Sequence, residues 1–107
     1  MSRVLLLDPD GDHAKQIEWV LRGISCQTTA CTDVQGALSL LQRRQFDVVL
    51  VVSVPGVDWD LRVDFIRRAV IRLPDSPQIV CLLRGPYRNP AERVYAARKG
   101  FKVVYEQ

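Results

Sequence analysis

Short apolar runs alternate with amphipathic stretches along the whole 107-residue chain, and this alternation is the feature that most constrains the fold. Runs with the length and β-branched content of buried strands cover residues 3–7, 25–31, 46–52, 78–83 and 101–105. The segments between them repeat apolar residues every three or four positions, as helices packed on a sheet do. Strands that alternate with helices over short connections predict an α/β fold, a parallel sheet with helices on both faces.

The first two predicted helices carry recognisable start signals. Asp10 or Asp12 can cap the first helix, and Gly23 can close it. Thr32 or Asp33 can cap the second. We expect their inner faces to consist of Ala14, Ile17, Val20 and Leu21 in the first helix, and of Val34, Ala37, Leu38 and Leu41 in the second.

Two further helices are predicted in the second half of the chain. One covers residues 58–73. The other starts at Asn89 and Pro90 and runs to about Lys99, where Gly100 ends it. The inner face of the 58–73 helix is expected to hold Leu61, Phe65, Ile66, Ala69 and Leu73.

Length and composition narrow the functional classes. One domain over residues 1–107 is expected, since 48% of the residues are apolar and 25% charged, ordinary globular usage. The longest apolar stretch, residues 48–52, is far shorter than the ~20 residues of a membrane-spanning helix, so we expect a cytoplasmic protein without a membrane partner. The cysteines form no CxxC pair, which predicts free thiols. A net charge of +3 gives little reason to expect nucleic-acid binding.

In this order and spacing, the segments resemble the receiver domain of bacterial response regulators, the CheY-like family of two-component signal transduction. The resemblance covers nearly the whole chain and rests on residues 3–8, 30–41, 46–50, 55–58 and Gly100. It implies a flavodoxin-like, doubly wound, five-stranded parallel sheet of order 2-1-3-4-5. The ligand crevice would lie at the carboxyl ends of the first and third strands, where the order reverses.

Receiver domains use Mg²⁺ to transfer a phosphoryl group to an aspartate at the end of the third strand. The family spacing places this acceptor at Val51 when counted back from Pro55, or at Val52 when counted forward from Asp47. No carboxylate lies between Asp47 and Asp58. Asp47 is at the other end of the strand, on the order of 16 Å away. The resemblance therefore implies a receiver that lacks its acceptor.

The acids that hold Mg²⁺ in the family are also reduced. Asp8 matches the first, Pro9 replaces the second, and Asp10 follows. Alternation along an extended chain can aim Asp8 and Asp10 the same way, so a weak Mg²⁺ site stays open as an alternative to a helix cap and a loop charge. We otherwise expect no cofactor.

The groups that bind the phosphoryl oxygens are missing as well. Leu82 or Leu83 stands where the family has a threonine or serine, and Gln107 where it has a lysine. Ser53 has a hydroxyl near the crevice, but no base partners it, because His13 is expected to be exposed on the first loop or helix turn. We expect no enzyme activity.

A basic and aromatic surface follows the fourth predicted strand. Arg84, Arg88 and Arg93 surround Tyr87, and Trp59 lies near the third strand's end. Such a surface fits an acidic protein, a nucleotide phosphate or RNA, although a solvated loop and helix face explains it equally simply. We expect protein partners here.

No residues remain for the fifth helix that completes the receiver fold, so one sheet face should be open; the chain is then a fragment of a longer protein or pairs as a homodimer. The predicted function is a pseudo-receiver that signals through contacts and not through phosphotransfer. Two alternatives stay open: a phosphorelay receiver with an atypical acceptor, and a small-ligand or nucleotide-binding module.

Overall fold

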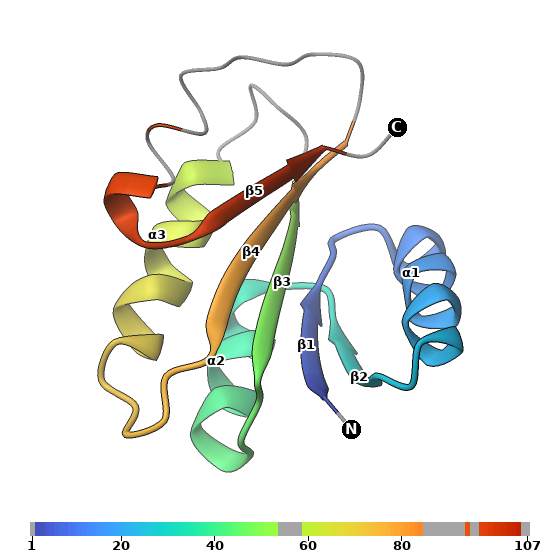
Figure 1. The fold of residues 1–107 in the computed structure, drawn as a ribbon, viewed down its shortest axis with the longest axis horizontal. Helices are drawn as coiled ribbons and strands as arrows, with labels where there is room; N and C mark the ends of the chain where they lie inside the picture. The colour runs from blue at the N-terminus through green and yellow to red at the C-terminus, as the bar shows by residue number, and fades with distance from the viewer. Residues whose placement is uncertain (1, 54–58, 85–93, 95–96, 106–107) are drawn as a thin grey trace.

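The computed structural model describes residues 2–53, 59–84, 94 and 97–105, and of these the side chains of 53 and 59–61 are not described. The strands form one parallel sheet of order β2-β1-β3-β4-β5, which confirms the predicted topology (Figure 1). The elements are β1 (Arg3–Leu7), α1 (Gly11–Gly23), β2 (Gln27–Cys31), α2 (Val34–Arg43), β3 (Val48–Ser53), α3 (Trp59–Val70), β4 (Gln78–Leu83) and β5 (Lys102–Tyr105).

The strand order reverses between β1 and β3. From β1 the chain moves outward to β2, and from β3 it moves the other way to β4 and β5. The register pairs Leu7 with Cys31 on one side and with Val51 on the other. The reversal therefore lies at the carboxyl ends of β1 and β3, which is where a crevice forms in such folds.

Alternation along the strands divides the core into two layers. Leu5, Leu7 and Val51 point to one face and pack under α2 and α3, whereas Leu6 and Val52 point to the other face, where α1 packs (Figure 1). All five side chains are at most 1% exposed. The continuous apolar runs of the sequence thus reflect strands that are buried on both faces.

The inner faces of two helices differ from the prediction. Val20 in α1 is 63% exposed, and Phe65 in α3 is 54% exposed. Val63 and Val70 are buried in α3 beside the correctly predicted Ile66. The helical spacing predicts a wide apolar stripe on each helix. Which part of that stripe is buried depends on where the sheet lies beneath the helix.

The helix ends follow local chemistry in most places. Asp10 caps α1 and Asp33 caps α2, each accepting hydrogen bonds from backbone amides of the first turn. Gly100 has a φ of 81°, the left-handed conformation expected where a helix ends. Gly23 is the last residue of α1 but does not make the left-handed turn. The helix thus ends at Gly23 as predicted, and the left-handed turn follows at Ser25, with a φ of 62°.

The sheet face under α1 is less completely covered toward β5. On that face Val104 of β5 is 47% exposed, while Leu82 of β4 is half-buried. This agrees with the expectation of an open face. Of the helix predicted from Asn89, Val94 and residues 97–99 are helical, and the rest lies outside the described residues. No helix in the described part of the chain has both the length and the apolar character needed to cross a membrane.

Candidate functional site at the carboxyl edge of the sheet

Asp8 lies directly after β1 and is fully buried. One carboxylate oxygen, Oδ1, accepts a hydrogen bond from the backbone amide of Asp10 at 2.9 Å. The other, Oδ2, lies 2.5 Å from Nδ1 of His13 in the first turn of α1. We assign Nδ1 of the imidazole as the donor and the carboxylate oxygen as the acceptor of this hydrogen bond. Both carboxylate oxygens are therefore engaged by groups of the chain itself.

His13 is only 5% exposed, so the predicted exposed position is wrong. The helix cap explains its orientation. Asp10 Oδ1 accepts from the backbone amides of Asp12 and His13, and this fixes the first turn of α1 directly over the end of β1. A histidine two residues after the first helical position is thereby turned inward. The spacing of five residues between Asp8 and His13, with a cap between them, is the signal that the sequence carried.

Asp10 joins this group to the end of β4. Its second oxygen, Oδ2, accepts from a guanidinium nitrogen of Arg84 at 3.2 Å, in a pair that is partly exposed. The hydrogen bond from the His13 amide, and secondarily the Arg84 guanidinium, hold the pKa of Asp10 below its usual value. The loop after β1 and the end of β4 are thus tied together across β3.

This arrangement bears directly on the predicted Mg²⁺ site. Mg²⁺ usually keeps several water ligands and binds through exposed carboxylates. Here Asp8 is buried against His13, and Asp10 caps a helix and pairs with Arg84. Within the described residues, no group of three or more histidine, cysteine or acidic side chains is placed to hold a metal ion.

Both candidate acceptor positions are buried valines. Val51 points to the α2 and α3 layer and Val52 to the α1 layer. Continuing the register by one residue beyond the pair of Leu7 and Val51 brings Val52 level with Asp8, on the face that α1 covers. Of the two counts made on the sequence, the geometry therefore favours Val52.

The remaining predicted site residues are only partly brought together. Pro9 is exposed between the two acids, and Leu82 is half-buried on the α1 face. Ser53 ends β3 opposite Leu83, but its side chain is not described. Arg84 pairs with Asp10 at this edge. Tyr87, Arg88, Arg93 and Gln107 lie outside the described residues, as does the side chain of Trp59.

Cys31 borders the same edge of the sheet from β2. Its carbonyl oxygen accepts from the Asp8 amide at 3.0 Å, and its thiol lies 3.5 Å from the carbonyl oxygen of Leu6. Burial, and secondarily the Asp33 carboxylate, raise the pKa of the Cys31 thiol to about 11. The thiol is therefore protonated at neutral pH and is a poor nucleophile.

We expect Cys31 to react with iodoacetamide on the order of a hundredfold more slowly at pH 8 than a small free thiol, because so little thiolate is present. The rate should rise with pH until about 11. Mass spectrometry of a Cys26→Ser variant measures it without interference from the neighbouring cysteine. A rate that levels off near pH 8.5 would contradict the raised pKa.

Solved structures with the same fold are response regulators. A response regulator from Thermotoga maritima superimposes with a TM-score of 0.82 at 17% identity, over 99% of this chain and 85% of that one. The chemotaxis response regulator CheY4 of Vibrio cholerae gives 0.77 at 18% identity, over 99% and 87%. The response regulator TrrA, solved in complex with the histidine kinase ThkA, gives 0.74 at 17% identity, over 100% and 87%.

These likenesses establish the fold. The chain has the five-stranded, doubly wound architecture of CheY-like receiver domains, as the resemblance in the sequence implied. No protein-family model matches the sequence, and no curated protein matches it in a sequence search.

Proposed function

We propose that this chain is a pseudo-receiver, a domain of the response-regulator type that signals through protein contacts and accepts no phosphoryl group. The observation that carries the proposal is the buried pair of Asp8 and His13 beside Val52. Phosphotransfer to a receiver needs a carboxylate nucleophile and a metal held by free carboxylate oxygens. Here the nucleophile position is apolar, and the first metal-binding acid is engaged by an imidazole.

The hydrogen bonds at the carboxyl edge of the sheet support the proposal that this edge has one fixed structure and does not switch between two conformations. Asp8, His13, Asp10 and Arg84 connect the end of β1, the start of α1 and the end of β4. Each carboxylate has a partner without any added ion. We infer that the edge holds one conformation, and that any regulation comes from a bound protein.

A protein partner is the natural ligand of such a domain. TrrA is bound by a histidine kinase in its solved complex, and we propose a signalling protein as the partner of this chain as well. We further propose that the domain acts in the cytoplasm, is not an enzyme and needs no cofactor. The surface around Arg84 stays the predicted contact region.

The test records backbone amide NMR spectra with Mg²⁺ alone, and then with Mg²⁺ and beryllofluoride, which mimics a phosphoryl group on aspartate. We expect no saturable, fluoride-dependent shifts at Asp8 to His13 or in β3. Val52 offers no oxygen to the beryllium, and Asp8 is bound to His13. A receiver domain that retains its acceptor aspartate serves as the positive control.

Saturable shifts that require fluoride would contradict the pseudo-receiver proposal and support a phosphorelay receiver with an atypical acceptor. Shifts with Mg²⁺ alone at Asp8 and Asp10 would show that the cation site survives. That result would contradict only the part of the proposal that concerns the metal.

A further inference from the structure

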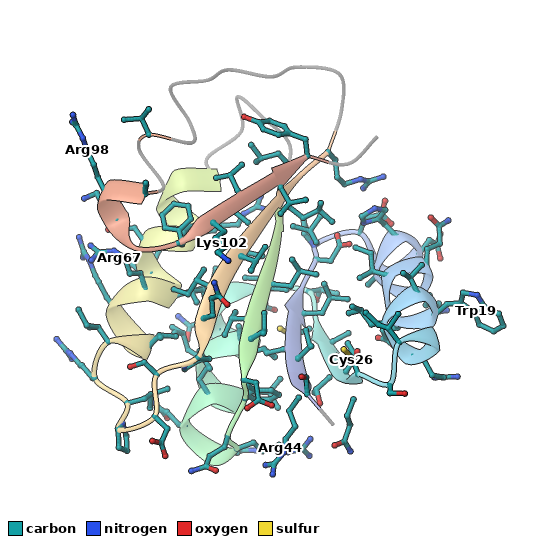
Figure 2. The ribbon with its side chains drawn as sticks, in the orientation of Figure 1. Trp19, Cys26, Arg44, Arg67, Arg98 and Lys102 are labelled. Atoms are coloured by element: carbon teal, nitrogen blue, oxygen red, sulfur yellow. The ribbon has the colours of Figure 1, made fainter. Side chains whose placement is uncertain are left out.

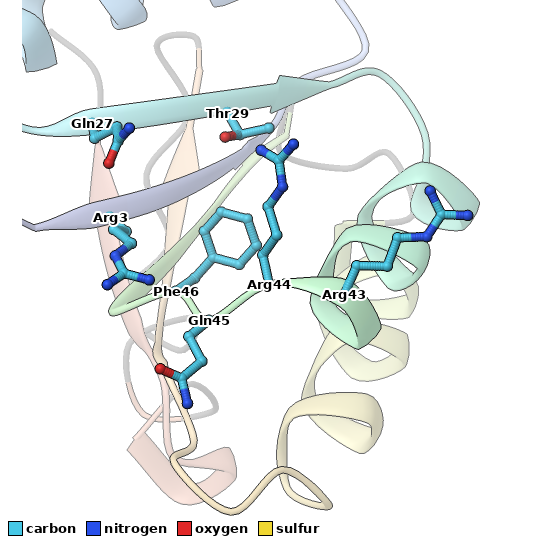
Figure 3. Close-up of a pocket in the computed structure, with 7 residues that line it drawn as sticks. All are labelled: Arg3, Gln27, Thr29, Arg43, Arg44, Gln45 and Phe46. Atoms are coloured by element: carbon cyan, nitrogen blue, oxygen red, sulfur yellow. The ribbon is translucent and has the colours of Figure 1, made fainter.

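A cavity of about 520 Å³ lies at the amino edge of the sheet, opposite the edge that holds Asp8. Figure 3 shows that its wall is built from the first residues of β1 and β2 and from the connection between α2 and β3. Its volume is in the range of pockets that hold small ligands. The lining residues are Arg3, Gln27, Thr29, Arg43, Arg44, Gln45 and Phe46.

This cavity is strongly basic. Arg3, Arg43 and Arg44 line it, and none of its lining residues is acidic. No carboxylate in the described part of the chain forms an ion pair with these three guanidinium groups. Asp47 lies next to the cavity, because its Oδ2 accepts from the backbone amide of Arg3 at 2.7 Å, but it forms no ion pair with the Arg3 guanidinium.

The positive charge of the cavity is large compared with the net charge of the whole chain. The chain has 15 lysine and arginine residues and 12 acidic ones. Without the three arginines of the cavity, basic and acidic residues would be equal in number. The three arginines of the cavity thus carry as much positive charge as the net charge of the whole chain, +3. This concentration of positive charge in one concave site favours an anionic ligand.

The side chains differ in how they face the cavity. In Figure 3, Arg3 and Arg44 lie on either side of the Phe46 ring, and Arg44 extends toward Thr29. Arg43 extends along α2, away from the Phe46 ring, and compensates the helix dipole from the last turn of α2. Arg3 and Arg44 are therefore the arginines that a ligand would engage most directly.

We propose that this cavity binds a small phosphate monoester, with Arg3 and Arg44 as the residues that contact the phosphate. The planar guanidinium fork matches phosphate oxygens in bidentate geometry. The Thr29 hydroxyl and the amides of Gln27 and Gln45 can hydrogen-bond neutral polar groups of the same ligand. A concave site of this volume suits a compact molecule better than an extended acidic peptide. This site is separate from the edge proposed for signalling and goes beyond that function.

Adenosine 5′-monophosphate is the probe, followed by amide NMR of the whole chain. We expect saturable shifts at Arg3, at Gln27 to Thr29 and at Arg43 to Phe46. Adenosine should cause none of these shifts, and inorganic phosphate should bind the same amides more weakly. High salt should weaken binding, because the arginines are solvent-accessible.

Arg44→Ala is expected to weaken the binding of the monophosphate about tenfold or more, through loss of charge-assisted hydrogen bonds. Arg44→Lys should bind the monophosphate more tightly than Arg44→Ala but more weakly than the native chain, since lysine keeps the positive charge and loses the bidentate guanidinium group. Arg98→Ala is the matched control, because Arg98 is exposed at the other end of the molecule (Figure 2) and should change nothing. Amide spectra of each variant confirm that it folds.

Several outcomes would overturn the proposal. If adenosine or inorganic phosphate binds as tightly as adenosine 5′-monophosphate, a phosphate monoester is not what the cavity recognises. Equal loss of affinity in Arg44→Ala and Arg98→Ala would mean nonspecific charge attraction. Tighter binding of a tetraglutamate peptide would assign the cavity to an acidic protein partner instead.

Discussion

Replacing His13 with alanine is expected to lower the free energy of unfolding by about 3 to 5 kcal/mol, among the largest effects of any single change in this chain. The substitution removes the group that donates to Asp8 Oδ2 and leaves a carboxylate that is fully buried. A buried charge without a partner costs far more than the pair itself contributes. Urea denaturation followed by circular dichroism measures the change.

Two further variants show whether the loss comes from the pair. Asp8→Asn in the His13→Ala background removes the unpaired charge and should recover part of the stability, which a double-mutant cycle quantifies. Gln16→Ala changes an exposed position of the same helix and should stay within about 0.5 kcal/mol of the native chain. If His13→Ala is as stable as Gln16→Ala, the pair does not stabilise the fold.

Restoring a carboxylate at the acceptor position is expected to be equally damaging. Val52→Asp should destabilise the domain by about 4 kcal/mol or more, because Val52 is 1% exposed and packs against Leu6 and Ala14. The new carboxylate would also stand level with Asp8, and two like charges in a buried site oppose each other. Thermal and urea unfolding at pH 7 measure the loss.

The matched control for this variant is Val52→Asn, which has nearly the same shape without the charge. Burial raises the pKa of an introduced aspartate, so its penalty should shrink as the pH falls and the side chain protonates. The asparagine variant should show no such recovery. Added Mg²⁺ should not restore the stability of Val52→Asp. A clear restoration would mean that Asp8 and the new carboxylate can hold a metal ion together, which would contradict the part of the proposal that concerns the metal.

The two ends of the sheet have opposite character. At the carboxyl edge, the described acidic groups are paired with groups of the chain itself, through His13 and Arg84. At the amino edge, three arginines line a cavity without a carboxylate in its wall. Binding of a small ligand is therefore better supported at the amino edge, although folds of this type usually bind ligands at the carboxyl edge.

Predictions based on backbone chemistry agreed well with the structure. The strands have continuous apolar runs, and Asp10, Asp33 and Gly100 act as predicted at helix ends, because these signals depend on a few neighbouring residues. Predictions of burial within helices were less accurate. Val20 and Phe65 lie at the edge of an apolar stripe, and whether such a residue is covered depends on the sheet below it.

The sequence by itself determined the order of strands and helices and the parallel sheet, because both depend on periodicity, and it showed valines where the family resemblance places an acceptor. Only the tertiary structure decided that His13 is buried against Asp8, that Arg84 reaches Asp10, and that Arg3 and Arg44 line one cavity. Arg84 and Asp10 are 74 positions apart, and Arg3 and Arg44 are 41 positions apart. A local sequence pattern cannot predict that such residues lie close together, because it is the pairing of β1 with β3 and of β3 with β4 that brings them close.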